Sequence, residues 1–169
     1  MKLHVPLLIL FFGAAPPMPA QTPAPVPSEC RQFDFWVGEW EVTDQQTGKK
    51  AGENSITLAH GNRVLLESWR SASPFTGSSV NAYDATTKRW HQCWMDSSGS
   101  VLDLYGGLDD GRMVLAGETA PAPGIRQLER ITWTPNPDGT VRQHWEQSTD
   151  GGKTWQTAFD GLYRRKTAP

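Results

Sequence analysis

Hydrophobic and polar residues alternate with a period of two through most of the chain, from about residue 38 onward. This period is typical of β-strands, in which successive side chains face opposite sides of a sheet. Clusters of Gly, Asn, Asp and Pro interrupt the alternation at regular intervals, as hairpin connections require. The pattern predicts ten strands, near residues 38–44, 50–60, 63–71, 77–84, 88–96, 100–107, 111–118, 125–135, 140–148 and 154–165.

No segment after residue 37 keeps a helical period over three turns, so we expect an all-β fold. Ten short strands with tight turns predict an antiparallel meander, which can pack as a sandwich or close into a barrel. Closure removes the exposed edges of a flat sheet, and we therefore expect a barrel.

The densest aromatic run of the chain, residues 33–42 (FDFWVGEWEV), combines two periods. Phe33, Trp36 and Trp40 are spaced three and four residues apart, which places them on one face of a helical turn. From Gly38 onward the period is two, with Trp40 and Val42 on one side. The stretch predicts a short helical turn that closes one end of the barrel and leads into the first strand.

Five of the predicted strands carry tryptophan or tyrosine on the same face as polar side chains. Burial of an unpaired polar group costs roughly 1–3 kcal/mol, so a purely structural core would exclude them. Aromatic walls with a few amides and one carboxylate are typical of a small-molecule cavity. The predicted lining is Glu67, Trp69, Asn81, Tyr83, Gln92, Trp94, Trp133, Gln143 and Trp145. Two alternatives are a filled interior, in which these side chains bond to one another, and an outward orientation of the same face.

The N-terminal composition predicts export. Lys2 precedes an apolar run and a stretch of small residues and prolines that ends at Ala20, the order of a secretory signal peptide. We expect a signal peptide at 1–20, a proline-rich linker at 21–29 and a barrel domain at 30–166. The mature protein is then periplasmic or extracellular, without a membrane anchor. The formal charge of −2 argues against a nucleic-acid partner, which would call for a basic surface.

Two cysteines, Cys30 and Cys93, would enter an oxidising compartment. A disulfide between them would tie the N-terminal turn to a strand in the middle of the barrel. The alternative is a free Cys30 thiol with Cys93 as a small apolar residue, because the sequence does not fix the distance between them.

Sequence motifs of catalysis or metal binding are absent. The chain has no GxSxG elbow, phosphate loop, CxxC or HExxH. His91 and His144 fall on the face opposite the tryptophans. His144 with Glu146 could form an acid–base pair, but an exposed pair is the simpler interpretation. We expect no metal and no cofactor. If Glu67 is buried, desolvation should raise its pKa.

The opening Gly38-Glu39-Trp40 resembles the Gly-x-Trp start of the calycins, the superfamily of lipocalins and fatty-acid-binding proteins. The resemblance implies that this tryptophan closes the barrel base beneath an arginine near the C-terminus, here Arg164 or Arg165. Nitrobindin-like heme barrels share the motif, but no histidine of this chain aligns with their proximal ligand.

Most of the domain is similar to a bacterial secreted family, a domain of unknown function within the calycin superfamily. The stretches that carry this resemblance are FDFWVGEWEV (33–42), LLESWR (65–70), NAYDATTKRWHQCWMD (81–96), VRQHWEQSTDGGKTW (141–155) and FDGLYRR (159–165). The resemblance implies a calycin-like barrel and no particular activity.

A second motif, residues 148–155 (STDGGKTW), resembles the Asp-box of sialidase propellers. There the serine and aspartate brace a hairpin turn and the tryptophan packs beneath it. A single copy cannot make a propeller, so we expect it to form the hairpin between the last two strands.

The sequence therefore supports three functional hypotheses. The first is an exported barrel that binds a small, partly apolar or aromatic molecule in its interior. The second is an enzyme that uses Glu67, or His144 with Glu146, in the same cavity. The third is a filled barrel that acts as a structural or protein-interaction module. Neither the ligand nor the oligomeric state follows from the sequence.

Overall fold

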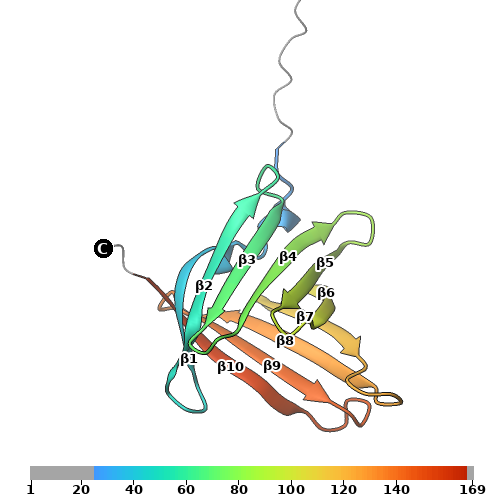
Figure 1. Cartoon of the computed structure of the whole chain (residues 1–169). Helices are drawn as coiled ribbons and strands as arrows, with labels where there is room; N and C mark the ends of the chain where they lie inside the picture. The colour runs from blue at the N-terminus through green and yellow to red at the C-terminus, as the bar shows by residue number, and fades with distance from the viewer. Residues whose placement is uncertain (1–24, 167–169) are drawn as a thin grey trace, which may run out of the picture.

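Every strand of the structure pairs with its neighbours in the chain, and the first strand pairs with the last to close the sheet (Figure 1). The computed structural model describes residues 25–166. The ten antiparallel strands are β1 (Gly38–Asp44), β2 (Lys50–Ala59), β3 (Val64–Ser71), β4 (Thr76–Asp84), β5 (Arg89–Asp96), β6 (Val101–Asp109), β7 (Arg112–Thr119), β8 (Gln127–Pro135), β9 (Val141–Ser148) and β10 (Gln156–Arg165). The predicted all-β meander closed into a barrel is confirmed.

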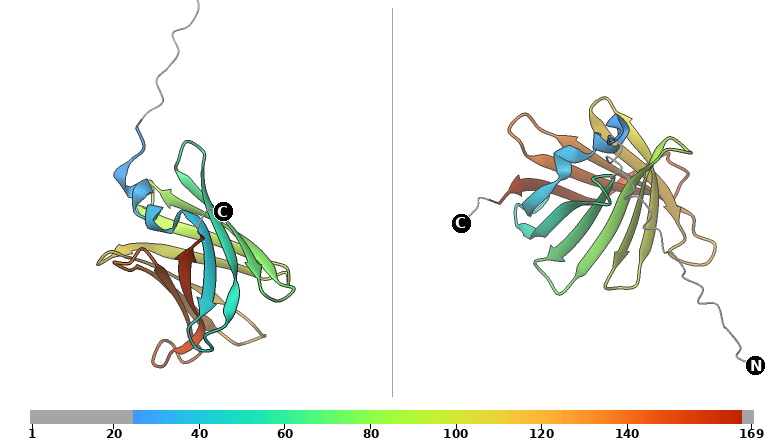
Figure 2. Two further views of the ribbon diagram at one scale, coloured as in Figure 1. Left: turned by 90° about the vertical axis from the view of Figure 1, so that its left-hand side faces the viewer. Right: turned by 90° about the horizontal axis from the view of Figure 1, so that it is seen from above.

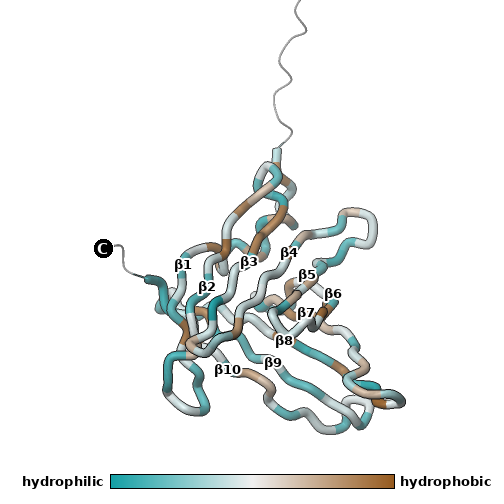
Figure 3. The backbone as a smooth tube through the Cα atoms, viewed as in Figure 1, coloured by the Kyte–Doolittle hydropathy of each residue, from teal (hydrophilic) through white to brown (hydrophobic). Residues whose placement is uncertain are grey.

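Closure of the barrel depends on the pairing of β1 with β10. The register places Trp40 opposite Arg165 and Val42 opposite Tyr163. Buried and more exposed residues alternate along strands such as β2 and β8, and hydrophobic and hydrophilic stretches are mixed along the tube in Figure 3. Because the closed sheet leaves no free edge, every strand is hydrogen-bonded on both sides.

Two short 3₁₀ turns, η1 (Ser28–Arg31) and η2 (Asp34–Trp36), precede the first strand. The view from above in Figure 2 shows them lying across one end of the barrel. We call residues 28–36, which contain both turns, the N-terminal plug. The end of the barrel that they cover is the closed end. Phe33 and Trp36 are fully buried there, as the aromatic spacing predicts.

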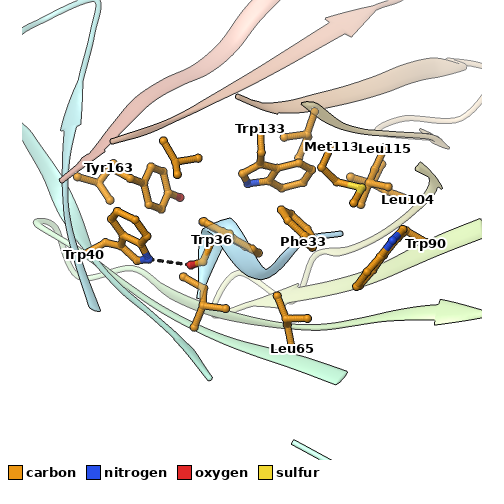
Figure 4. Close-up of a cluster of buried hydrophobic side chains, with 14 of the residues drawn as sticks. Phe33, Trp36, Trp40, Leu65, Trp90, Leu104, Met113, Leu115, Trp133 and Tyr163 are labelled. Carbon is orange, nitrogen blue, oxygen red and sulfur yellow. Dashed lines mark hydrogen bonds between the residues drawn. The ribbon is translucent and has the colours of Figure 1, made fainter. Parts of the chain in front are cut away.

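The aromatic side chains of the plug form the centre of the core (Figure 4). The ring of Phe33 stacks on Trp36 with centroids 4.9 Å apart. Trp133 meets Phe33 at 5.2 Å and Trp36 at 5.4 Å. Paired aromatic rings contribute about 0.5–1.5 kcal/mol beyond their burial. These contacts fill this end of the barrel.

Trp40 links the plug to the barrel wall. Its indole nitrogen donates to the Trp36 carbonyl at 2.8 Å, the dashed bond in Figure 4. The guanidinium of Arg165 lies 4.3 Å from the Trp40 ring centroid and donates to the Val37 carbonyl at 3.0 Å. The expectation that an arginine near the C-terminus covers this tryptophan is confirmed for Arg165.

The hairpin between β9 and β10 has the hydrogen bonds that the STDGGKTW motif predicts. Asp150 accepts from Ser148 Oγ at 2.8 Å and from the backbone nitrogens of Lys153 and Thr154 at 2.9 Å. The Trp155 indole donates to the Gly152 carbonyl at 3.1 Å. These bonds hold residues 149–155 in the turn, so β10 begins at Gln156, two residues later than the sequence pattern suggested.

The two cysteines are not bonded to each other. Cys30 is buried in η1, whereas Cys93 is partly exposed on β5 and neighbours His91 on the outer face. The disulfide is therefore not present, and the alternative of free thiols holds. The predicted signal peptide lies outside the described residues. Within residues 25–166, no helix has the length and apolar character needed to cross a membrane.

Candidate functional site: an interior cavity at the open end

The half of the barrel opposite the plug contains a cavity of about 450 Å³. It opens between the hairpins that join β1 to β2, β3 to β4 and β5 to β6. The interior wall is made by Glu67, Trp69, Gln92, Trp94, Leu102, Ile131, Gln143, Trp145, Phe159 and Tyr163, and the rim by Asp44, Thr47, Lys49, Lys50, Ala51, Ser71, Phe75, Asp96 and Ala158. Cavities of this size hold a small organic molecule in other proteins.

Glycines on neighbouring strands make room for two of the wall indoles. A Cβ atom at Gly77 would lie 2.2 Å from the Trp94 ring, and one at Gly52 would lie 2.8 Å from the Trp69 ring. Each indole therefore packs closely over bare backbone of the adjacent strand. The sequence keeps large aromatic side chains inside the barrel while leaving space at its centre.

The floor of the cavity is organised around Glu67 on β3. One carboxylate oxygen accepts from Asn54 Nδ2 at 2.7 Å, and the other accepts from Ser79 Oγ at 2.5 Å. Asn54 and Ser79 lie on β2 and β4, the two strands that flank β3. The register of three consecutive strands thus fixes the orientation of this carboxylate.

A chain of side-chain amides continues the network along β4 and β5. Asn81 Nδ2 donates to Ser79 Oγ at 2.8 Å, and Gln92 Nε2 donates to Asn81 Oδ1 at 2.7 Å. Asn81 is fully buried behind Gln92, which itself reaches the cavity. The amide nitrogens of Asn81 and Gln92 therefore donate within this chain. The other amide atom of Gln92, Oε1, accepts no hydrogen bond from the described residues.

Tyr163 joins the floor from β10. Its hydroxyl accepts from Asn54 Nδ2 at 3.3 Å and donates to Gln143 Oε1. Burial, and to a lesser degree the neighbouring Glu67, raises the pKa of Tyr163 well above its ordinary value. The phenol therefore stays protonated and serves as a hydrogen-bond donor to Gln143.

Burial raises the pKa of Glu67 from 4.5 to about 7, and the bonds from Ser79 and Asn54 oppose this rise only in part. No lysine, arginine or histidine within residues 25–166 forms an ion pair with it. Desolvation of the charged form is the expected cause for a carboxyl group in such surroundings. The prediction that Glu67 is buried with a raised pKa is confirmed.

A second buried carboxylate, Glu129 on β8, lies behind the cavity wall. Glu129 accepts from Trp145 Nε1 and Thr119 Oγ1 at 2.7 Å, and from Gln127 Nε2 at 2.8 Å. Trp145 lines the cavity, whereas Glu129 does not. The indole therefore lies between the buried Glu129 carboxyl and the cavity.

The structure brings six of the nine predicted lining residues together in the cavity: Glu67, Trp69, Gln92, Trp94, Gln143 and Trp145. The other three face inward but lie elsewhere. Asn81 is one layer behind Gln92, Trp133 packs in the aromatic core of the closed end, and Tyr83 packs against Trp90 at 6.2 Å. A period of two gives the face of a strand but not the height along the barrel, and height separates these three from the cavity.

The pair His144 and Glu146 does not lie in the cavity, so the prediction that placed it there is wrong. Trp145 between them points inward, and alternation turns both neighbours to the outer face. There Glu146 bonds to Arg130 at 3.0 Å, and His144 lies 3.7 Å from Glu146. Among residues 25–166, no group of three or more His, Cys, Asp or Glu side chains could hold a metal ion.

Several site residues were missed in the sequence. Asn54, Tyr163 and Phe159 face inward with the correct parity on β2 and β10, but the hydrophilic and glycine-containing surroundings obscured their alternation. Glu129 lies two residues before Ile131 and four before Trp133, on the same face of the strand. The alternation that predicts an inward Glu67 therefore also predicts an inward Glu129. The rim residues come from turns, where no period exists.

The fold and the site together define a closed ten-stranded β-barrel with a packed end and a cavity at the other. No protein-family model matches the chain, and no curated protein matches it in sequence. The functional conclusion therefore depends on the geometry of the cavity.

Proposed function

We propose that the protein binds a small, partly apolar molecule in the cavity of its open end, as an exported barrel of the calycin type. The observation that carries this proposal is the composition of the wall. Trp69, Trp94, Trp145 and Phe159 offer apolar area, while Glu67 and its partners form one polar floor. Aromatic walls provide burial, and a few fixed polar groups provide orientation.

The hydrogen bonds of the floor support binding over a purely structural role. A structural network would satisfy its members, yet Gln92 Oε1 and Gln143 Nε2 have no partner among the described residues. Gln92 and Gln143 also reach the cavity surface. A ligand with polar atoms can form the hydrogen bonds that these fixed side chains lack.

Titration of the intrinsic tryptophan fluorescence against small lipophilic and aromatic compounds tests the proposal. Three of the chain's tryptophans line the cavity, so a bound molecule should change the emission in a saturable way. Ile131→Phe, which adds volume to the wall, should weaken binding at least about tenfold. A panel that gives no saturable change would contradict the proposal.

Glu146→Gln is the matched control for binding inside the barrel. Its side chain is on the outer face of β9, bonded to Arg130. The affinity of this variant should equal that of the wild-type protein, whereas Glu67→Gln should alter it. Equal effects of both substitutions would mean that the compounds bind outside the cavity.

One observation favours a second candidate, proton transfer to or from a bound molecule. A carboxyl group with a pKa of about 7 at the base of an accessible cavity is suited to general acid–base chemistry. Mass spectrometry of a bound compound after long incubation separates the two functions. An unchanged compound supports binding alone, and a product that Glu67→Gln fails to form supports catalysis.

A further inference from the structure

Two carboxylates are buried in the open half of the barrel, and neither has a cation as partner. Glu67 is 6% exposed and Glu129 is 2% exposed. Neither forms an ion pair with a lysine, arginine or histidine of residues 25–166. Buried charges are normally paired. The interior is therefore a place where a positive charge would be stabilised.

The indoles of the wall are hydrogen-bonded in a way that favours the same charge. Trp145 Nε1 donates to Glu129 at 2.7 Å, and Trp94 Nε1 donates to Asp96 at 3.2 Å. A carboxylate that accepts from an indole nitrogen polarises the ring and makes its π-face more negative. Such a face attracts a cation more strongly than that of a free indole.

The floor also has acceptors with spare capacity, beside one donor, Gln143 Nε2, that is free of partners within residues 25–166. The hydrogens of Asn54, Ser79, Asn81 and Tyr163 are directed to partners inside the network. Gln92 Oε1, on a side chain that reaches the cavity, accepts nothing from the described residues, and each oxygen of Glu67 accepts only one bond. A ligand that brings several N–H donors would complete this floor.

We propose that the cavity binds an organic ammonium ion, with the charged nitrogen on the floor against Glu67 and an apolar body in contact with Trp94 and Trp145. This inference rests on the proposed binding function and specifies its ligand class. A primary ammonium brings three donors for the acceptors of the floor and the positive charge that the floor lacks. The aromatic wall binds both the apolar body and the charge.

The charged residues at the mouth of the cavity carry no excess of positive charge that would repel a cation. Lys50 is neutralised by Glu41 at 3.0 Å and Glu53 at 2.8 Å. Asp44, Lys49 and Asp96 are the other charged residues of the rim. A cation that enters the cavity therefore passes the carboxylates of Asp44 and Asp96 and one lysine, Lys49, which has no ion-pair partner within residues 25–166.

Ligands that differ in charge around the same aromatic body test the inference. We suggest isothermal titration of the wild-type protein with 4-phenylbutylamine, 4-phenylbutan-1-ol and 4-phenylbutanoate at pH 8. The amine should bind at least about tenfold more tightly than the alcohol, and the carboxylate should bind most weakly. Equal or tighter binding of the alcohol or the carboxylate overturns the inference.

The pH dependence of amine binding gives a second readout. Other titratable or charged groups in or behind the cavity wall are Tyr163 on β10, Glu129 behind Trp145 on β8, and the rim residues Asp44, Lys49, Lys50 and Asp96. The other polar side chains around Glu67 are the uncharged Asn54, Ser79, Gln92 and Gln143. The amine stays protonated below pH 9, so ionisation of Glu67 should dominate. Binding should weaken about tenfold from pH 8 to pH 6. A flat profile overturns the inference.

Two variants separate the charge of the floor from the aromatic wall. Glu67→Gln should remove the pH dependence and reduce the preference for the amine over the alcohol. Trp94→Leu keeps an apolar wall but removes the π-face, so amine binding should weaken more than alcohol binding. Glu146→Gln, on the outer face, should leave both affinities unchanged. Equal weakening of amine and alcohol by Trp94→Leu contradicts the contact with this indole.

The outcomes distinguish this inference from the proposed function on which it rests. If the alcohol binds in the cavity and the amine does not bind more tightly, the binding function holds and the ammonium ligand is wrong. If the whole panel fails to bind, both are wrong. Thermal unfolding of each variant shows whether it is folded, and the wild-type pH profile does not depend on any variant.

Discussion

Glu67 shows, at the scale of one residue, how burial without a cation affects stability. The carboxyl has a pKa of about 7 in the folded protein and about 4.5 in a solvated chain. The folded state therefore holds its proton at pH values where the unfolded state has lost it. Stability is highest when the group is protonated in both states and decreases as the pH rises from 4.5 to 7.

The first stability prediction concerns this pH range. A shift of this size corresponds to about 3 kcal/mol, since one pKa unit is about 1.4 kcal/mol. Glu67→Gln removes the titrating group and keeps its shape. The free energy of unfolding of this variant, relative to the wild-type protein, should increase by up to about 3 kcal/mol between pH 4.5 and pH 8. Urea titrations across this range measure it.

Glu53→Gln is the control for this experiment. Hydrogen bonds from Lys166 and Lys50 lower the pKa of Glu53 to about 2, so its linkage acts in the opposite direction. Its stabilising contribution is present above pH 4.5 and is lost as the pH falls toward 2. This variant should show no change of slope between pH 5 and pH 8. A wild-type protein whose stability is constant through that range would contradict the raised pKa of Glu67.

The site was only partly predictable at this scale. Alternation along β3 and β5 was enough to predict that Glu67 and Gln92 face inward, because alternation is a local property of a strand. The partners of Glu67 depend on the register between strands, which no local pattern contains. Asn54, thirteen residues away in sequence, therefore could not be assigned to it.

At the scale of elements, the N-terminal plug fills the closed end of the barrel with aromatic side chains. Trp36 is fully buried and contacts Phe33, Trp133 and Tyr163. The plug thus connects residues at the start, the middle and the end of the chain. A 3₁₀ turn has little stability alone, so these tertiary contacts hold it in place.

Trp36→Ala is the corresponding prediction. Removal of a large buried aromatic side chain leaves a cavity that the rigid barrel cannot fill, and typically costs about 3–5 kcal/mol. The melting temperature should drop sharply. Val101→Ala, at a position 56% exposed, should change stability by less than about 0.5 kcal/mol. Similar melting temperatures for the two variants would show that the plug contributes little to stability.

Element boundaries were predicted well where turn chemistry is explicit. The positions of all ten strands follow from alternation interrupted by Gly, Asn and Asp, because those residues suit the tight turns of a meander. The start of β10 differs because Asp150 binds backbone nitrogens as far as Thr154 and extends the turn. Such a bond joins residues four positions apart, whereas the alternation has a period of two and does not reveal it.

At the scale of the whole molecule, the barrel consists of a filled half and a hollow half. Both the filled-interior interpretation and the cavity interpretation of the sequence therefore describe part of it. Aromatic residues alone did not distinguish them, since Trp133 is in the filled half and Trp145 in the hollow one. The difference arises from the plug, which fills only the end from which the chain enters.

The global arrangement also predicts the state of the cysteines. Cys30 lies inside the closed end, and Cys93 lies on the outer surface of β5, so the wall of the barrel separates their side chains. Alkylation of the unfolded protein without reductant should modify both thiols. Mass analysis should give the same result after prior reduction. A gain of two alkyl groups only after reduction would show a disulfide and contradict this arrangement.

The pairing of β1 with β10 has a practical consequence for handling the protein. Residues 38 and 165 lie at the same end of the cylinder, so both ends of the described chain leave the molecule beside the plug. Tethering to a sensor surface or fusion to a carrier through either terminus would leave the mouth pointing away from the attachment. Binding measurements on immobilised samples should therefore agree with those made in free solution.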